Sequence, residues 1–180
     1  MKRRRTQQVD GLAHSCTLLA IDPAATSGVA CFVNGALSFH APVDSALSRL
    51  SAIHEAHFAA SRHKASPIII AIEGWAGSWK SWKTAVGAGV ALGRWFEVLE
   101  QNGHRRDHVV EMALATWRSR AGVGKCSDSK AYKRRAIEMV ERKFGTTVGA
   151  DEAEAILMGD VACRSPEVGE MLGTIERARK

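Results

Sequence analysis

Short apolar runs and amphipathic stretches alternate along the chain, and the first of them predict strands. Two apolar, β-rich runs occupy residues 17–21 and 28–33. Asn34-Gly35 follows the second run, and this dipeptide is the strongest short-range signal for a hairpin. Residues 36–40 are therefore expected to return as a third strand. The N-terminal region predicts a three-stranded antiparallel meander.

The rest of the chain alternates predicted helices with predicted strands. Two further apolar runs, at 68–72 and 109–113, predict buried strands, whereas the basic stretch 117–129 is expected to be a loop. Apolar residues at helical spacing, bounded by caps, glycines and prolines, predict helices over about 45–63, 82–101, 128–144, 150–164 and 167–179. This order predicts an α/β fold with one mixed five-stranded sheet, an antiparallel meander followed by parallel strands, flanked by helices.

Composition narrows the class of protein. The 180 residues are 46% apolar and 24% charged, which is typical of a globular domain. The longest apolar run is far shorter than the ~20 residues of a membrane span, and no signal-peptide pattern follows MKRRR. We expect a basic flexible arm over 1–16, a single domain over 17–180, no membrane partner and a location in the cytoplasm of a bacterium or a phage-infected host.

Scattered cysteines predict reduced core thiols at Cys16, Cys31, Cys126 and Cys163.

Charge is distributed unevenly along the chain. The formal net charge is +6, and residues 105–143 alone carry eleven basic and five acidic side chains. Residues 144–180 carry four basic and seven acidic side chains. A basic stretch beside an acidic one is expected where a polyanion is held next to a metal or acid-base site. A solvated helix face is the alternative that charge alone leaves open.

Two carboxylates stand at the ends of predicted strands. Asp22 follows the run TLLAI, and Glu73 follows the run IIIAI. A carboxylate at the end of a buried strand is costly without a partner, and the carboxyl ends of strands are where α/β folds place their sites. One such residue is explained by a turn or a cap. Two of them favour a functional site.

A second pair of acids begins a predicted helix. Asp151 and Glu154 are three residues apart and project from one helix face, whereas Glu152 is expected to point elsewhere and Asp160 to be solvated. With the two strand-end acids, four carboxylates can converge. Oxygen-only ligands suit Mg²⁺ or Mn²⁺ rather than zinc.

Three segments resemble the motifs of RuvC-type Holliday junction resolvases. They are LLAIDPAATSGVACFVNG at 18–35, IIIAIEGW at 68–75 and VGADEAEAILMGDVACR at 148–164. The resemblance implies an RNase H-like nuclease, a homodimer that cuts branched DNA at four-way junctions with two Mg²⁺ ions per active site, for which Mn²⁺ can substitute. By position, it implies that the metal-binding catalytic residues are Asp22, Glu73, Asp151 and Glu154.

The sequence departs from this family in several places. Ala24 stands where the family usually has Gly, and Glu154 stands where it usually has a second Asp. The sixteen residues before the first strand and the Trp-rich segment after Glu73 also differ from bacterial housekeeping members. These departures indicate a phage or prophage branch.

Basic and aromatic residues surround the acidic motifs. Tryptophans and lysines directly after Glu73 suit stacking on unpaired bases and contact with phosphates, and the resemblance makes Trp75 or Trp79 a wedge at the junction centre. Trp82 is expected in the core. More cations precede the acid pair at 151–154, where phosphates must come. The predicted DNA-binding residues are Trp75, Trp79, Lys80, Lys83, Arg118, Arg120, Lys125, Lys130, Lys133 and Arg134.

Small residues recur every fourth position at Ala85, Gly89 and Gly93, which favours either a homodimer contact or packing on the chain's own sheet.

Two alternative functions are an RNase H-fold nuclease for RNA or RNA/DNA hybrids and a non-catalytic branched-DNA-binding module. No nucleotide cofactor is expected, because in GWAGSWKS, at 74–81, Trp79 replaces the second glycine of a phosphate-binding loop.

Overall fold

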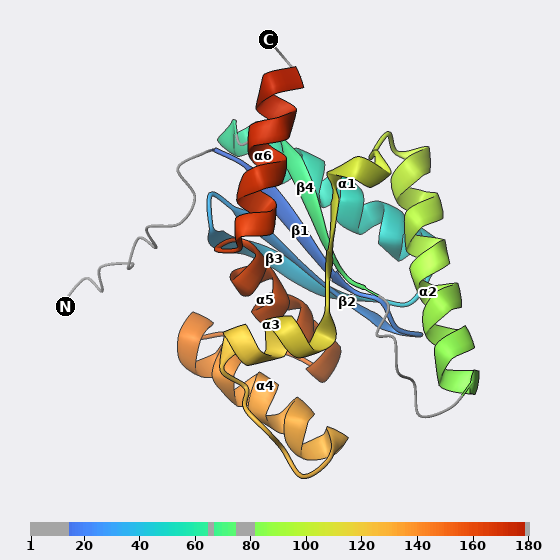
Figure 1. Ribbon diagram of the computed structural model, residues 1–180, viewed down its shortest axis with the longest axis vertical. Helices are drawn as coiled ribbons and strands as arrows, with labels where there is room; N and C mark the ends of the chain where they lie inside the picture. The colour runs from blue at the N-terminus through green and yellow to red at the C-terminus, as the bar shows by residue number, and fades with distance from the viewer. Residues whose placement is uncertain (1–14, 65–66, 75–81, 179–180) are drawn as a thin grey trace, which may run out of the picture.

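A five-stranded mixed sheet forms the centre of the protein (Figure 1). The computed structural model describes residues 15–64, 67–74 and 82–178. Strands β1, β2 and β3 are antiparallel neighbours, and β4 and β5 continue the sheet parallel to β1. Across the sheet, the order is β3 (Ala36–Val43), β2 (Ser27–Val33), β1 (Thr17–Asp22), β4 (Ile68–Glu73) and β5 (Val109–Met112). The predicted mixed sheet is confirmed.

Helices cover both faces of the sheet (Figure 1). One apolar core lies between the sheet and the first two helices, and the other lies between the sheet and the last four. The helices are α1 (Ala46–His63), α2 (Trp82–Gln101), α3 (Leu114–Ala121), α4 (Ser129–Phe144), α5 (Ala150–Ala162) and α6 (Pro166–Ala178), and a short 3₁₀ turn, η1 (Arg106–His108), precedes β5.

Alternation along the strands divides their side chains between the two cores. On β1, Leu18 and Ala20 lie in the core beneath α5, whereas Leu19 and Ile21 lie in the core beneath α1 and α2. All four are fully buried. Because helices cover both faces of the sheet, the sequences of the central strands are continuous apolar runs and do not alternate between apolar and polar residues.

Local signals in the sequence set several of the predicted boundaries. Asn34 and Gly35 have φ of 51° and 77°, the pair of positive values that a two-residue type I′ hairpin requires. Ser45 caps α1 by accepting from the backbone N–H of Ser48, and Asp128 caps α4 in the same way at Ala131. The predicted hairpin and the predicted starts of these two helices are confirmed. Strand β3 extends to Val43, three residues beyond its predicted end.

The structure corrects three predictions. Residues 114–121 form helix α3, where the sequence predicted a loop from 117, because Trp117 is fully buried and anchors the helix to the core. Trp82 is 72% exposed rather than in the core. Cys126 is half-buried, whereas the other three cysteines are buried as predicted and free.

The ends of the chain and the connection after β4 contain predicted features that the structure does not describe. Most of the predicted arm over 1–16 lies outside the described residues, as do Trp75, Trp79 and Lys80. Over the part of the chain that is described, no helix is both long enough and apolar enough to cross a membrane.

Candidate active site

Strand geometry turns two carboxylates toward the same helix. Asp22 has the parity of Leu18 and Ala20 on β1, and Glu73 has the parity of Ala71 on β4, so both face the side of the sheet that α5 covers. Strands β1 and β4 are parallel neighbours, and the last pair of residues in their register is Ile21 and Ile72, each one residue before its acid. The two acids therefore end adjacent strands at one edge of the sheet.

A glycine allows α5 to approach this edge closely. Gly28 lies opposite Asp22 in the β1–β2 pairing, and a Cβ atom built on Gly28 would lie 1.9 Å from the backbone oxygen of Asp151. Real Cβ atoms do not approach so closely, and only glycine fits here without displacing the helix. The contact places the first turn of α5 beside the end of β1.

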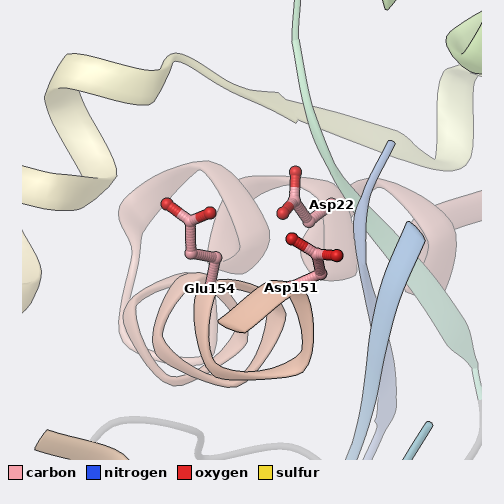
Figure 2. Close-up of side chains that lie close together, drawn as sticks. All are labelled: Asp22, Asp151 and Glu154. Atoms are coloured by element: carbon pink, nitrogen blue, oxygen red, sulfur yellow. The ribbon is translucent and has the colours of Figure 1, made fainter. Parts of the chain in front are cut away.

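Three carboxylates converge at the contact between β1 and α5 (Figure 2). One ligand oxygen from each of Asp22, Asp151 and Glu154 lies within 4.8 Å of the others. Glu152 points away, as predicted, since it accepts from the backbone N–H of Gly149 and pairs with Nδ1 of His40 at 2.7 Å. The i, i+3 spacing thus brings the predicted pair to the strand-end acid.

Burial raises the proton affinity of the strand-end acids. The pKa of Asp22 lies well above its usual range because of burial first, and because of the charges of Glu73, Glu154 and Asp151. The Lys133 ammonium partly opposes this rise. A cluster of this kind is stabilised by cations.

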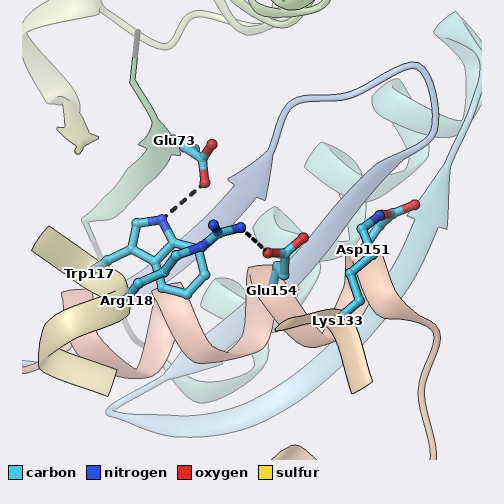
Figure 3. A network of polar contacts seen from close by, with 6 residues as sticks. All are labelled: Glu73, Trp117, Arg118, Lys133, Asp151 and Glu154. Carbon is cyan, nitrogen blue, oxygen red and sulfur yellow. Dashed lines mark hydrogen bonds and ion pairs between the residues drawn. The ribbon is translucent and has the colours of Figure 1, made fainter. Parts of the chain in front are cut away.

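Glu73 stands at the margin of the three-acid cluster. Its Oε2 accepts a hydrogen bond of 3.0 Å from Nε1 of Trp117 (Figure 3), and Glu73 is not among the three acids whose oxygens converge within 4.8 Å. Burial raises its pKa to about 7, against the opposing effects of the Trp117 hydrogen bond and the Arg118 charge. The structure therefore groups three of the four predicted acids and places the fourth beside them.

Two of the predicted DNA-binding cations contact the acids directly (Figure 3). Nη2 of Arg118, on α3, lies 2.5 Å from Oε1 of Glu154. Nζ of Lys133, on α4, lies 2.8 Å from Oδ1 of Asp151. Both pairs join the helix that carries the acids to a neighbouring helix.

The remaining described cations of the predicted set lie on the surface. Arg120 pairs with Glu167 at 3.2 Å, across α3 and α6. The others are exposed and belong to α2, the α3–α4 connection and α4: Lys83, Lys125, Lys130 and Arg134. Asp160 is not solvated as predicted, because it accepts from Lys143 and Arg164 and its side chain is only 12% exposed.

Sequence reasoning missed Trp117 and the pairing of Arg118 with Glu154. Leu114, Trp117 and Ala121 recur at i, i+3 and i+7, a weak helical signal that the surrounding cations and glycines obscure. The guanidinium of Arg118 also lies 3.7 Å from the centre of the Tyr132 ring. Nothing in the sequence identifies this stacking partner.

The residues at the cluster fit divalent metal ions that bind oxygen. Asp22, Asp151 and Glu154 offer only carboxylate oxygens, which suit Mg²⁺ and Mn²⁺. The mutual repulsion that raises the pKa of Asp22 is relieved when a cation shares the site. Asp22 and Asp151 are half-buried and Glu154 is buried, so an ion here would be partly shielded from water.

Comparison with solved structures identifies the fold. The chain is 16% identical to Thermus thermophilus RuvC in complex with a Holliday junction substrate, with a TM-score of 0.53 over 87% of this chain and 96% of that chain. A second T. thermophilus RuvC structure gives 16% identity and a TM-score of 0.52 over 85% and 96%. The sequence matches no family model and no curated protein sequence. Three sequence motifs implied a RuvC-like, RNase H-like fold, and the comparison confirms that fold.

Proposed function

We propose that the protein is a Mg²⁺-dependent endonuclease that cuts branched DNA, with four-way junctions as its principal substrate. The observation that carries this proposal is the convergence of Asp22, Asp151 and Glu154 at the edge of a RuvC-like sheet. The known structure with that fold and a bound Holliday junction supports the class of substrate.

Each acid has its own part in the proposed reaction. Asp22, Asp151 and Glu154 would hold the ions, and Glu73 would complete the site from the adjacent strand. Mg²⁺ supplies activation of the attacking water and neutralisation of charge on the leaving oxygen. The Trp117 hydrogen bond fixes the carboxylate of Glu73 on the side of the cluster nearest β4. The ions held by these acids would position the scissile phosphate.

The proposed DNA contacts lie beside this site. Exposed cations on α4 and before it, among them Lys125, Lys130 and Arg134, would bind phosphates and position the DNA without reading its sequence. We also propose that Trp75 and Trp79, in the segment that follows Glu73, stack on unpaired bases at the branch point. Selectivity would then come from the shape of the branched substrate.

The first half of α2 supports a homodimer. The buried residues of this helix begin at Ala91, whereas Trp82, Val86 and Val90 are 72%, 53% and 48% exposed. These three recur every fourth residue beside the small-residue stripe of the sequence, and together they form an exposed apolar face, which is typical of an interaction site. A second copy of the chain would cover it, so that two active sites act on the two strands of one junction.

A substrate panel tests the proposed function. Labelled four-way junction, linear duplex, RNA/DNA hybrid and single strands are each incubated with the protein in Mg²⁺ or in EDTA. We expect symmetrical nicks in the junction in Mg²⁺ and none in EDTA. Preferential cutting of the hybrid would instead indicate an RNase H-type enzyme. Tight junction binding without cutting under any condition would indicate a non-catalytic binding module.

A further inference from the structure

Two acids of the proposed metal site already have cationic partners. Arg118 contacts Glu154, and Lys133 contacts Asp151, at 2.5 and 2.8 Å (Figure 3). A charge-assisted hydrogen bond from a cation stabilises the carboxylate oxygen that accepts it, and this stabilisation is lost when a metal ion takes the place of the cation. Ions and these side chains therefore compete for the same oxygens.

The two cations are placed where they can leave the acids without disturbing the fold. Glu154 has a side chain that is only 7% exposed, but Arg118 and Lys133 have side chains that are 29% and 45% exposed. The cations come from α3 and α4, whereas both acids belong to α5. Lys133 can turn toward solvent, and Arg118 can break its bond to Glu154 with its guanidinium still on the Tyr132 ring. The helix with the acids then stays in place.

Arg118 is only partly satisfied by its carboxylate. Its Nε is buried without a hydrogen-bond partner among the described residues, while its guanidinium stacks on the Tyr132 ring, 3.7 Å from the ring centre. Stacking keeps the guanidinium plane supported when the bond to Glu154 is broken. A planar fork with unused donors suits a phosphate, which accepts two parallel N–H bonds.

We propose that Arg118 and Lys133 are exchangeable counter-ions that couple DNA binding to metal binding. This inference rests on the proposed function. In the absence of DNA, the two cations neutralise Glu154 and Asp151 and compete with divalent ions. When a DNA phosphate reaches the site, the cations transfer to it and release both carboxylates to the ions. By linkage, DNA and ions then each increase the affinity for the other by the same factor.

Ion binding without DNA gives the first test. Calorimetry follows Mn²⁺ binding to the full chain after EDTA treatment and dialysis. Arg118→Gln and Lys133→Gln are each expected to bind Mn²⁺ roughly tenfold more tightly than wild type, because one charge-assisted hydrogen bond no longer competes. Arg142→Gln, which removes an exposed charge elsewhere on α4, is the control and should leave the affinity unchanged. Unchanged or weaker Mn²⁺ binding in both variants overturns the inference, and Lys133→Gln keeps the test valid if Arg118→Gln does not fold.

Junction binding gives the second test, which separates exchange from a fixed electrostatic effect. Fluorescence anisotropy measures the affinity for a labelled four-way junction in EDTA and in Ca²⁺, the probe ion here. Exchange predicts that Ca²⁺ tightens binding several-fold in wild type and clearly less in the Arg118→Gln, Lys133→Gln double variant. The same tightening in both proteins means that the cations stay in place, and overturns the inference.

Asp22→Asn separates failure of the inference from failure of the proposed function. If wild type binds Mn²⁺ and Asp22→Asn does not, the metal site stands and only the cation variants decide the exchange. If wild type itself does not bind Mn²⁺, the proposed metal site is wrong and the inference falls with it.

Discussion

Helices α5 and α2 are both rich in apolar residues, yet the fold uses them differently. Nine of the 13 residues of α5 are buried, so the helix is enclosed nearly all round by the sheet and by α3 and α4. Only four of the 20 residues of α2 are buried, and all four lie from Ala91 onward. Figure 1 shows the first half of α2 extending beyond the edge of the sheet.

This difference separates the enclosed candidate site from the proposed interaction surface. Enclosure fixes the position of α5, so Asp151 and Glu154 near its start have a defined geometry beside Asp22. The apolar side chains at the start of α2 contribute little to the fold and remain available to a partner. Changes near α5 should therefore abolish chemistry or stability, and changes on α2 should affect assembly.

The largest expected effect is at the three-acid cluster. Asp22→Asn should reduce junction cleavage by at least about 1,000-fold, because the removed charge holds the proposed ions, whereas junction binding in EDTA should be as tight as in wild type or tighter. Gel assays of cutting and binding measure both. Glu152→Gln is the matched control on the same helix turn, since Gln preserves the bond to the N–H of Gly149 and should leave the enzyme active. An active Asp22→Asn protein contradicts the site assignment.

The next effect tests the close approach of α5 to the sheet. Gly28→Ala places a Cβ 1.9 Å from the backbone oxygen of Asp151, so the start of α5 must move. We expect a loss of about 1–3 kcal/mol in the free energy of unfolding, measured in urea, together with loss of cleavage. Gly169→Ala, in α6, meets no atom within 4 Å and should stabilise the protein by about 0.5–1 kcal/mol. Equal stability of the two variants would show that α5 is not held as tightly as described.

A smaller effect, confined to assembly, is expected on α2. Val86→Glu places a charge in the middle of the exposed apolar face and should weaken a dimer at least about tenfold, with the unfolding free energy of the monomer unchanged. Light scattering over a range of concentrations measures the change. Phe58→Glu removes another exposed apolar side chain, on α1, and should not affect assembly. A wild-type protein that is monomeric at micromolar concentration removes the basis for the dimer.

The stability of the protein should also depend on pH in the absence of ions. The pKa of Glu73 rises from 4.5 to about 7 on folding, so the folded state binds a proton more strongly than the unfolded state between these values. Stability should therefore fall as pH rises from about 4.5 through 7, and Mg²⁺ should raise the melting temperature more at pH 8 than at pH 5.5.

A second titration has the opposite sign and must be separated from the first. Burial, with the charges of His57 and His108, lowers the pKa of His104 from 6.5 to about 4, so this residue destabilises the fold as pH falls below 6.5. The pKa of Asp22 is also raised, by burial first and by the charge of Glu73, so melting curves of Glu73→Gln measure the contribution of Glu73 together with its effect on Asp22. If this variant loses as much stability as wild type between pH 5.5 and 8, Glu73 is not the group responsible.

Much of the fold follows from the sequence because local signals agree with one another. Asn34-Gly35, the apolar runs and the strand-end acids each depend on a few neighbouring residues and on the two-residue alternation of a strand. The acids at 151 and 154 follow in the same way from helical spacing. The mixed five-stranded sheet agrees with the fold that the resemblance implies, and the structural match to RuvC covers 87% of the chain.

The parts that were not predicted depend on distant contacts. Trp82 is a large apolar residue at helical spacing, which predicts a core position, yet it is 72% exposed because α2 is buried only from Ala91 onward. Helix α3 exists because Trp117 reaches a core formed by other elements, and the partners of Glu73 and Glu154 come from that helix. No periodicity within residues 114–121 specifies those contacts.

The proposed nuclease requires that Asp22, Asp151 and Glu154 bind divalent ions together. Anomalous diffraction from crystals soaked in Mn²⁺ tests it most directly, because this ion scatters anomalously and accepts carboxylate oxygens. We expect a peak within about 2.0–2.4 Å of an oxygen from each of these three residues, and no peak there in Asp22→Asn crystals. A wild-type crystal that holds Mn²⁺ elsewhere but has no peak among the three carboxylates would contradict it.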